Sequence, residues 1–403
     1  MYVLKNRGWR ILLLFLCLLF SSNIIAQTDN IFRKTKKEIK IAMFLPLFYD
    51  NIDELSFNQY NIAEKRSKPY KCFSYISFYE GARIALDVLE NKGYKISLHV
   101  FDVGENDTSK TKEALQYEQM KEMNLIVPLV FKNSFDMIAS FARQNHIPVV
   151  NPMSTNMSIL ENECVFKIQP DDISKAQTIM KYIQEKHSKA NVIVLYENNK
   201  NNASLVEWYK GNISSYTSNW TIINYGKNAT KLKTYLKPER NNIIINLIEK
   251  SSLNDNKVFA NTLIKKLSSF SSYRITLFAP FDWLDYNNVD YSMMENLDYH
   301  FTLTYLNDYT NPNFVDFVKD YRKHFKTEPD KFYATLGYDI MLYFITALNT
   351  KGKDLQNAPN IKNDSQMINH YHFKHVNNLP GWQNETTTIY NIRNYKIKSE
   401  WSY

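Results

Sequence analysis

Cysteine is scarce in this sequence of 403 residues, with only three present. So few thiols exclude a disulfide-stabilised scaffold and a zinc module built on cysteine pairs. Glycine (9 residues) and proline (12 residues) are also rare, which excludes collagen-like and glycine-rich low-complexity chains. The motifs GxGxxG, GxxxxGK[ST], GxSxG and HExxH do not occur. We therefore expect a protein that is not an enzyme and holds no cofactor.

The excess of positive charge is small. Lys and Arg number 49 against 41 Asp and Glu, giving a formal charge of +8, and the charges are spread along the chain. We therefore expect no nucleic-acid partner. Hydrophobic residues make up 44% and charged residues 22%, as is typical of a globular chain. The length suits two lobes of about 150–200 residues each.

The first 26 residues have the layout of a secretory signal peptide. A basic stretch precedes the ten-residue apolar run 11–20, and a short polar stretch leads to Ala26. Ten apolar residues fall short of the roughly 20 that span a membrane, and no later stretch reaches 18. We expect cleavage after Ala26, a periplasmic location and no stable membrane insertion. The basic residues are Lys5, Arg7 and Arg10.

The rest of the chain alternates strand-like and helix-like segments. Near-continuous apolar strands separated by helices indicate parallel sheets that are covered on both faces. Two sets of the pattern predict an α/β fold with two doubly wound parallel-sheet lobes. A ligand would then bind at the carboxyl ends of the strands, between the lobes. Expected strands are 40–48, 95–102, 124–131, 147–152, 165–168, 191–196, 221–225, 242–248 and 274–279, and expected helices are 77–91, 111–122, 134–144, 173–186, 203–216 and 257–268.

Three features leave alternatives open. A polar insertion at 50–73 follows the first strand and would lie at the rim of the cleft, as a lid or as a disordered segment. The histidine cluster near residue 372 could form part of a metal site, but an exposed polar strand is the favoured interpretation. Cys72 and Cys164 could pair after export, although their separation in sequence does not decide this.

Five motifs, in order, resemble the type I periplasmic binding proteins, the Leu/Ile/Val-binding and receptor-ligand-binding group. The similarity extends from about residue 39 to the C-terminus, and the closest likeness is to a bacterial amino-acid-type substrate-binding subgroup. The last motif is the most specific, because it covers two helices and their joint. The motifs are KIAMFLPL (40–47), FYEGARIALDVL (78–89), VFDVGEND (100–107), IVPL with IPVVNPMST (126–129 and 147–155) and FVDFVKDYRKHFKTEPDKFYATLGYDIMLY (314–343).

The resemblance implies three crossings between the lobes, which we expect near Thr155, Tyr305 and Lys353. Lobe one would then comprise residues 38–155 and 306–353. Lobe two would comprise residues 156–305 and 354–403. Hinge motion about the crossings would close the cleft.

The resemblance also implies the pocket residues. Hydroxyls after the third and fourth strands would hold a ligand carboxylate, here Ser134, Ser154 and Thr155. Asp282 matches the acidic position that holds a ligand ammonium, while Tyr196 and Glu249 lie at other strand ends. The third-strand turn departs from the family pattern, because Val127, Phe131 and Lys132 replace smaller residues. Helix or turn capping is the alternative role for Ser154, Thr155 and Asp282.

The resulting hypothesis is an exported solute-binding protein that closes on a small polar ligand, with an amino acid as one candidate. A membrane permease of the ABC type would be its partner. The alternative is a scaffold or regulator of cell-envelope assembly on the same fold, with an envelope protein as partner. The altered third-strand turn keeps this alternative open.

Overall fold

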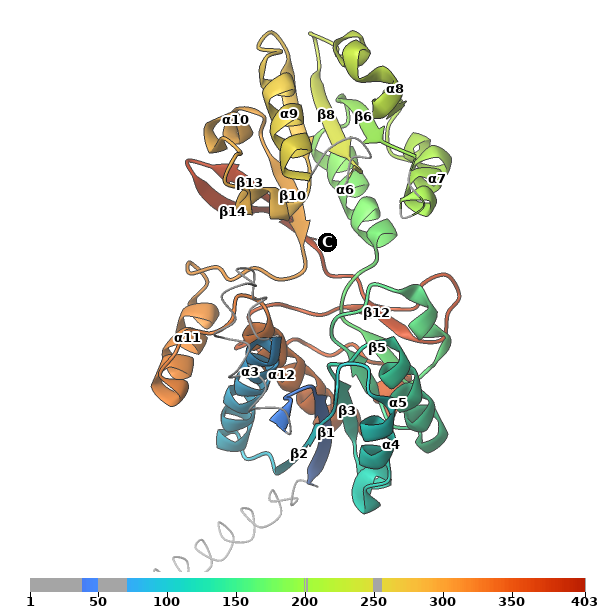
Figure 1. The fold of residues 1–403 in the computed structure, drawn as a ribbon, viewed down its shortest axis with the longest axis vertical. Helices are drawn as coiled ribbons and strands as arrows, with labels where there is room; N and C mark the ends of the chain where they lie inside the picture. Colours follow the sequence, from blue (N-terminus) through green and yellow to red (C-terminus); the bar gives the residue numbers. More distant parts are fainter. Residues whose placement is uncertain (1–37, 50–70, 199, 201, 249–255, 403) are drawn as a thin grey trace, which may run out of the picture.

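The computed structural model describes residues 38–49, 71–198, 200, 202–248 and 256–402. The predicted signal peptide, most of the insertion at 50–73 and Glu249 lie outside the described residues. Two seven-stranded sheets form two lobes, one above the other in Figure 1. The predicted α/β fold with two mostly parallel sheets is confirmed.

The first lobe is built on a sheet in the order β11-β12-β5-β4-β3-β1-β2. Its central strands are apolar and buried, because helices cover both faces. The strands are β1 (Ile39–Leu45), β2 (Ile96–Asp102), β3 (Leu125–Pro128), β4 (Val149–Asn151), β5 (Val165–Lys167), β11 (Phe373–Lys374) and β12 (Trp382–Asn384); the helices are α3 (Lys71–Asn91), α4 (Thr108–Leu115), α5 (Lys132–Asn145), α11 (Pro312–Phe325) and α12 (Tyr333–Lys351).

The second lobe repeats this plan with the order β14-β13-β10-β9-β8-β6-β7. Strands β13 and β14 add an antiparallel edge to its parallel strands. The strands are β6 (Asn191–Tyr196), β7 (Trp220–Asn224), β8 (Asn241–Asn246), β9 (Arg274–Phe278), β10 (His300–Leu303), β13 (Thr388–Arg393) and β14 (Lys396–Ser402); the longer helices are α6 (Asp172–Lys186), α7 (Ala203–Asn212) and α9 (Asn256–Ser268).

The chain passes between the sheets three times, at 168–171, 304–311 and 385–387. The passage near Tyr305 lies where the sequence analysis expects it. The first passage follows β5 instead of lying near Thr155, because β5 pairs with β4 and stays in the first sheet. The third passage follows β12 instead of lying near Lys353, because β12 pairs with β5.

Three smaller points concern the alternatives left open by the sequence. Cys164 is buried as a free thiol, and burial raises its pKa to about 11. His375 stacks on Trp382 with ring centroids 3.6 Å apart, and the described part of the chain contains no cluster of His, Cys, Asp and Glu that could hold a metal ion. None of the described helices is both long and apolar enough to cross a membrane.

Candidate functional site

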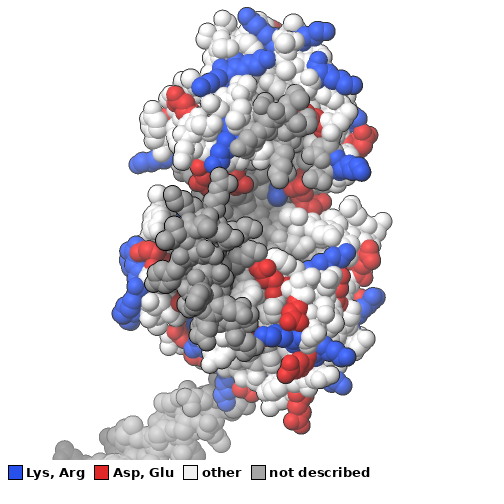
Figure 2. Space-filling model, in the orientation of Figure 1, with Lys and Arg blue, Asp and Glu red and all other residues white. Residues whose placement is uncertain are grey.

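Each lobe has a pocket at the carboxyl ends of its parallel strands. These two edges face each other, because β5, β10 and β12 all end at the passages between the lobes and the parallel neighbours end at the same edges. The first-lobe pocket measures about 390 Å³ and the second-lobe pocket about 420 Å³. The molecule narrows to a waist between the two lobes (Figure 2). The two pockets are therefore the halves of one candidate site.

The second-lobe pocket is acidic. Among the described residues, Asp172, Glu197 and Asp282 line it together with one cation, Lys175. The Lys175 ammonium lies 3.1 Å from the Asp172 carboxylate, so this pair is neutral. Glu197 and Asp282 add two further carboxylates to the described lining. Such a pocket favours a ligand group with positive charge.

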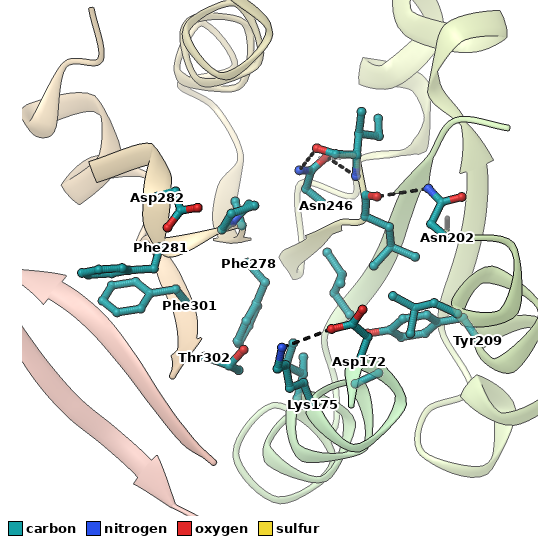
Figure 3. Close-up of a pocket in the computed structure, with 18 of the residues that line it drawn as sticks. Asp172, Lys175, Asn202, Tyr209, Asn246, Phe278, Phe281, Asp282, Phe301 and Thr302 are labelled. Atoms are coloured by element: carbon teal, nitrogen blue, oxygen red, sulfur yellow. Dashed lines mark hydrogen bonds and ion pairs between the residues drawn. The ribbon is translucent and has the colours of Figure 1, made fainter. Parts of the chain in front are cut away.

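Aromatic rings form one wall of the second-lobe pocket. Figure 3 shows Phe278, Phe281 and Phe301 grouped beside Asp282. The rings of Phe281 and Phe301 lie 5.1 Å apart between centroids. These rings would cover the apolar part of a ligand whose charged end lies at Asp282.

Two asparagines order the loop that follows β8. The Asn246 amide donates to the carbonyl oxygen of Ile248 at 3.1 Å, and the Asn202 amide donates to the carbonyl oxygen of Leu247 at 3.2 Å. Both side chains line the pocket and are drawn in Figure 3. One buried and one half-buried hydrogen bond thus hold this part of the pocket lining in place.

The first-lobe pocket is more apolar, and Lys132 and Asp136 are the charged residues among its described lining. Tyr75 and Tyr333 meet edge to face with ring centroids 5.9 Å apart, and half-exposed Phe131 also lines the pocket. The Tyr75 hydroxyl donates to the Glu105 carboxylate, and burial raises the pKa of Tyr75. Lys132 lines the pocket at the first turn of α5. A ligand with an apolar body and a negative group fits this surface.

The start of α5 adds to this preference for a negative group. Phe131, the N-cap residue, makes no side-chain capping hydrogen bond, but the backbone N–H of Asn133 donates to Asn106 Oδ1 at 3.0 Å. The other N–H groups of the first turn carry partial positive charge, which favours a nearby anion. Ser154 lies on the same pocket, and its Oγ accepts the backbone N–H of Asn156 at 3.1 Å. The Ser154 hydroxyl hydrogen can therefore still donate to a ligand oxygen.

The six residues chosen from the sequence lie in different places in the structure. Ser154 lines the first-lobe pocket and Asp282 the second-lobe pocket. Ser134 is fully buried, and its hydroxyl has no partner among the described residues. Neither Ser134 nor Thr155 lines either half of the site. Tyr196 lies at an adjoining hollow under the Lys210 ammonium, and Glu249 lies outside the described residues.

Several residues that line the two pockets were not identified from the sequence. Glu197 immediately follows β6, one residue after Tyr196, and lines the second-lobe pocket. Asp172 opens α6 just after the first passage, and finding it required the correct position of that passage. Tyr75 and Tyr333 lie on helices, where a search of strand ends does not look.

Comparison with known proteins identifies a matching family and solved structures of similar fold. The family model described as "Receptor family ligand binding region" matches residues 80–399. No curated protein matches the sequence. A branched-chain amino acid ABC transporter periplasmic ligand-binding protein from Burkholderia xenovorans superposes with a TM-score of 0.60 at 9% identity, covering 90% of this chain and 95% of that one.

Two further solved structures share the fold. An ABC transporter substrate-binding protein from Desulfitobacterium hafniense, in complex with Leu, has a TM-score of 0.54 at 16% identity, covering 90% of this chain and all of that one. A solute-binding protein of an ABC transporter from R. palustris, in complex with 4-hydroxybenzoate, has a TM-score of 0.54 at 13% identity. That likeness covers 91% of this chain and 97% of the other.

Proposed function

Since this chain belongs to the receptor family of ligand-binding regions, a family of binding proteins and not of enzymes, we propose that it binds one small ligand between its two lobes. The observation that carries the proposal is the pair of pockets on facing sheet edges. Either pocket alone would cover only one side of a ligand. Closure of the lobes about the three passages would bring both pockets onto the same molecule.

The ligand that suits both pockets is a zwitterion with an apolar body, which is the chemistry of an amino acid. Its carboxylate would lie at Lys132, Ser154 and the start of α5. Its ammonium would lie at Asp282 in the acidic second-lobe pocket. The bound molecules named for two similar structures, leucine and 4-hydroxybenzoate, both carry a carboxylate, which supports this orientation. Ser134, Thr155, Tyr196 and Glu249, chosen from the sequence, are not part of this proposal.

Export and transport follow from the same proposal. The basic and apolar layout of residues 1–26 supports cleavage after Ala26 and a periplasmic location. Several proteins of similar fold serve ABC transporters, so a membrane permease is the proposed partner. Sequencing the N-terminus of the mature protein tests export. We predict that the mature chain begins at Gln27.

The substitution Asp282→Asn should weaken ligand binding roughly 10-fold or more, because one charge-assisted hydrogen bond contributes about 1.5–3 kcal/mol. Isothermal titration measures the affinity and thermal denaturation measures the stability. Asp285→Asn is the matched control, because Asp285 is exposed in the same short helix and does not line the pocket. Equal affinities of the two variants, with Asp282→Asn less stable, would make Asp282 a capping residue.

A thermal-shift screen of free amino acids separates the proposal from the scaffold alternative. A ligand at 100 times its dissociation constant should add about 2.7 kcal/mol to the free energy of unfolding. A scaffold that binds no small molecule would show no shift with any compound.

A further inference from the structure

A basic pocket lies at the end of the second lobe that is farthest from the ligand site. It measures about 530 Å³ and is formed where the amino ends of β6, β8 and β9 meet the loops that precede them. The ligand pockets lie at the carboxyl ends of the same strands, so the two sites are on opposite edges of one sheet. Figure 2 shows Lys and Arg side chains gathered over this end of the upper lobe.

The charge of the basic pocket is strongly unbalanced. Four cations line it, and Glu239 is the one carboxylate among its lining residues. Glu239 lies 4.0 Å from Arg240, so three positive charges remain after this pair is counted. His187 also lines the pocket, and burial lowers its pKa, which keeps the ring neutral near pH 7. The four cations are Lys186, Lys189, Arg240 and Arg274.

A buried amide holds the basic loops in place. The Asn242 side chain is fully buried, and its amide nitrogen donates to the carbonyl oxygens of Lys237 at 3.0 Å, Arg240 at 3.2 Å and Arg274 at 3.1 Å. The Arg240 guanidinium donates to the carbonyl oxygen of Lys189 at 2.9 Å. The loops that carry the cations are therefore ordered before binding, which lowers the entropy lost when an anion binds.

We propose that this basic pocket binds a phosphate-bearing anion, at a site separate from the inter-lobe ligand site. Arginine presents a planar fork that pairs two hydrogen bonds with phosphate oxygens, and lysine adds a compact positive charge. Arg274 is exposed and pairs with no carboxylate among the described residues, so its guanidinium can turn toward such a ligand. The inference does not depend on the function proposed for the cleft.

The experiment uses the mature chain with two probes, pyrophosphate in solution and vesicles of phosphatidylglycerol, with phosphatidylcholine vesicles as the neutral comparison. The double variant Lys189→Gln/Arg274→Gln should weaken binding about 10-fold or more, because two charges next to the anion are lost. The matched control is Lys323→Gln/Lys331→Gln, which removes two exposed charges from the first lobe and should leave binding within about 2-fold.

The outcomes separate the sources of the phosphate. Binding of pyrophosphate that only the pocket variant loses indicates a soluble phosphorylated ligand. Binding to phosphatidylglycerol vesicles alone, lost in the same way, indicates a lipid head group. If the double variant does not fold, the single substitution Lys186→Gln should show the loss in the same direction. No binding of either probe, or equal weakening in the control variant, overturns the proposal.

Discussion

Replacing Gly337 with alanine should lower the free energy of unfolding by about 3 kcal/mol or more, because an added methyl group has no room between two helices. A Cβ atom at Gly337 in α12 would lie 2.1 Å from the carbonyl oxygen of Phe78 in α3. On the opposite side of the same crossing, a Cβ atom at Gly81 would lie 1.8 Å from the carbonyl oxygen of Ala334. The obstacle is backbone on both sides, so side-chain rotation cannot relieve it. Urea denaturation of the purified variant measures the change.

Gly211→Ala provides the matched control for this substitution. Gly211 is also within a helix, α7, but apart from its chain neighbours and the helix's own backbone no described atom lies within 4 Å of the position its Cβ would occupy. Alanine there should be neutral or should raise the stability by up to about 1 kcal/mol, through its higher helix propensity. If Gly337→Ala is as mild as Gly211→Ala, the close crossing of α3 and α12 is wrong.

Asp339→Ala should lower the free energy of unfolding by about 3 kcal/mol, because three buried or half-buried N–H groups would lose a charged acceptor. The fully buried carboxylate accepts from the backbone N–H of Ile368 at 2.8 Å, and from the backbone and side-chain N–H of Asn369 at 2.9 and 3.0 Å. Burial raises the pKa of Asp339 to about 7, and these donors oppose the rise. The substitution should also expose the amides of residues 368 and 369 to hydrogen exchange.

The control for Asp339 is Asp316→Ala on the neighbouring helix α11. Asp316 is exposed and, within the described part of the chain, forms an ion pair with Lys319 at 2.8 Å, an interaction that contributes little in water. Its replacement should change the stability by less than about 0.5 kcal/mol. Similar losses for the two variants would show that Asp339 does not anchor the segment after α12.

Gly337 and Asp339 show what one motif of the sequence encodes in the structure. The motif at 314–343 contains Gly337 and Asp339, and the structure gives each a physical role in packing α12. The long apolar strands of both sheets were likewise predictable, because burial on both faces leaves a strong pattern. The two-lobe plan followed from two sets of strands that alternate with helices.

The C-terminal strands were not predictable in the same way. Strands β11 and β12 are two and three residues long, too short for a pattern, and β12 is largely polar. Gln383 of β12 is nevertheless buried, because it accepts from the Lys167 ammonium of β5 at 2.6 Å. Burial lowers the pKa of Lys167 to about 8. The polar sequence of β12 carries no strand signal, so the third passage was expected too early, near Lys353. The strand at 165–168 was expected but was assigned to the second lobe, which moved the expected first passage to Thr155.

The sequence predicted only those residues of the candidate site that follow strands. Asp282 and Ser154 follow strands, so the rule that ligands bind at carboxyl ends finds them. Tyr75 and Tyr333 lie near the N-terminal ends of α3 and α12, and only tertiary packing brings them to the first-lobe pocket. The sequence carries no local signal for such residues.

The central claim is that the two pockets close on one ligand, and small-angle scattering tests it most directly. The protein should be measured alone and with a saturating amount of an amino acid identified by the thermal-shift screen. Because a ligand shifts the lobes only by binding the closed state more tightly, the radius of gyration should fall on binding. Asp282→Asn should need a higher ligand concentration for the same change. A radius that stays constant with every ligand that binds would contradict closure of the cleft.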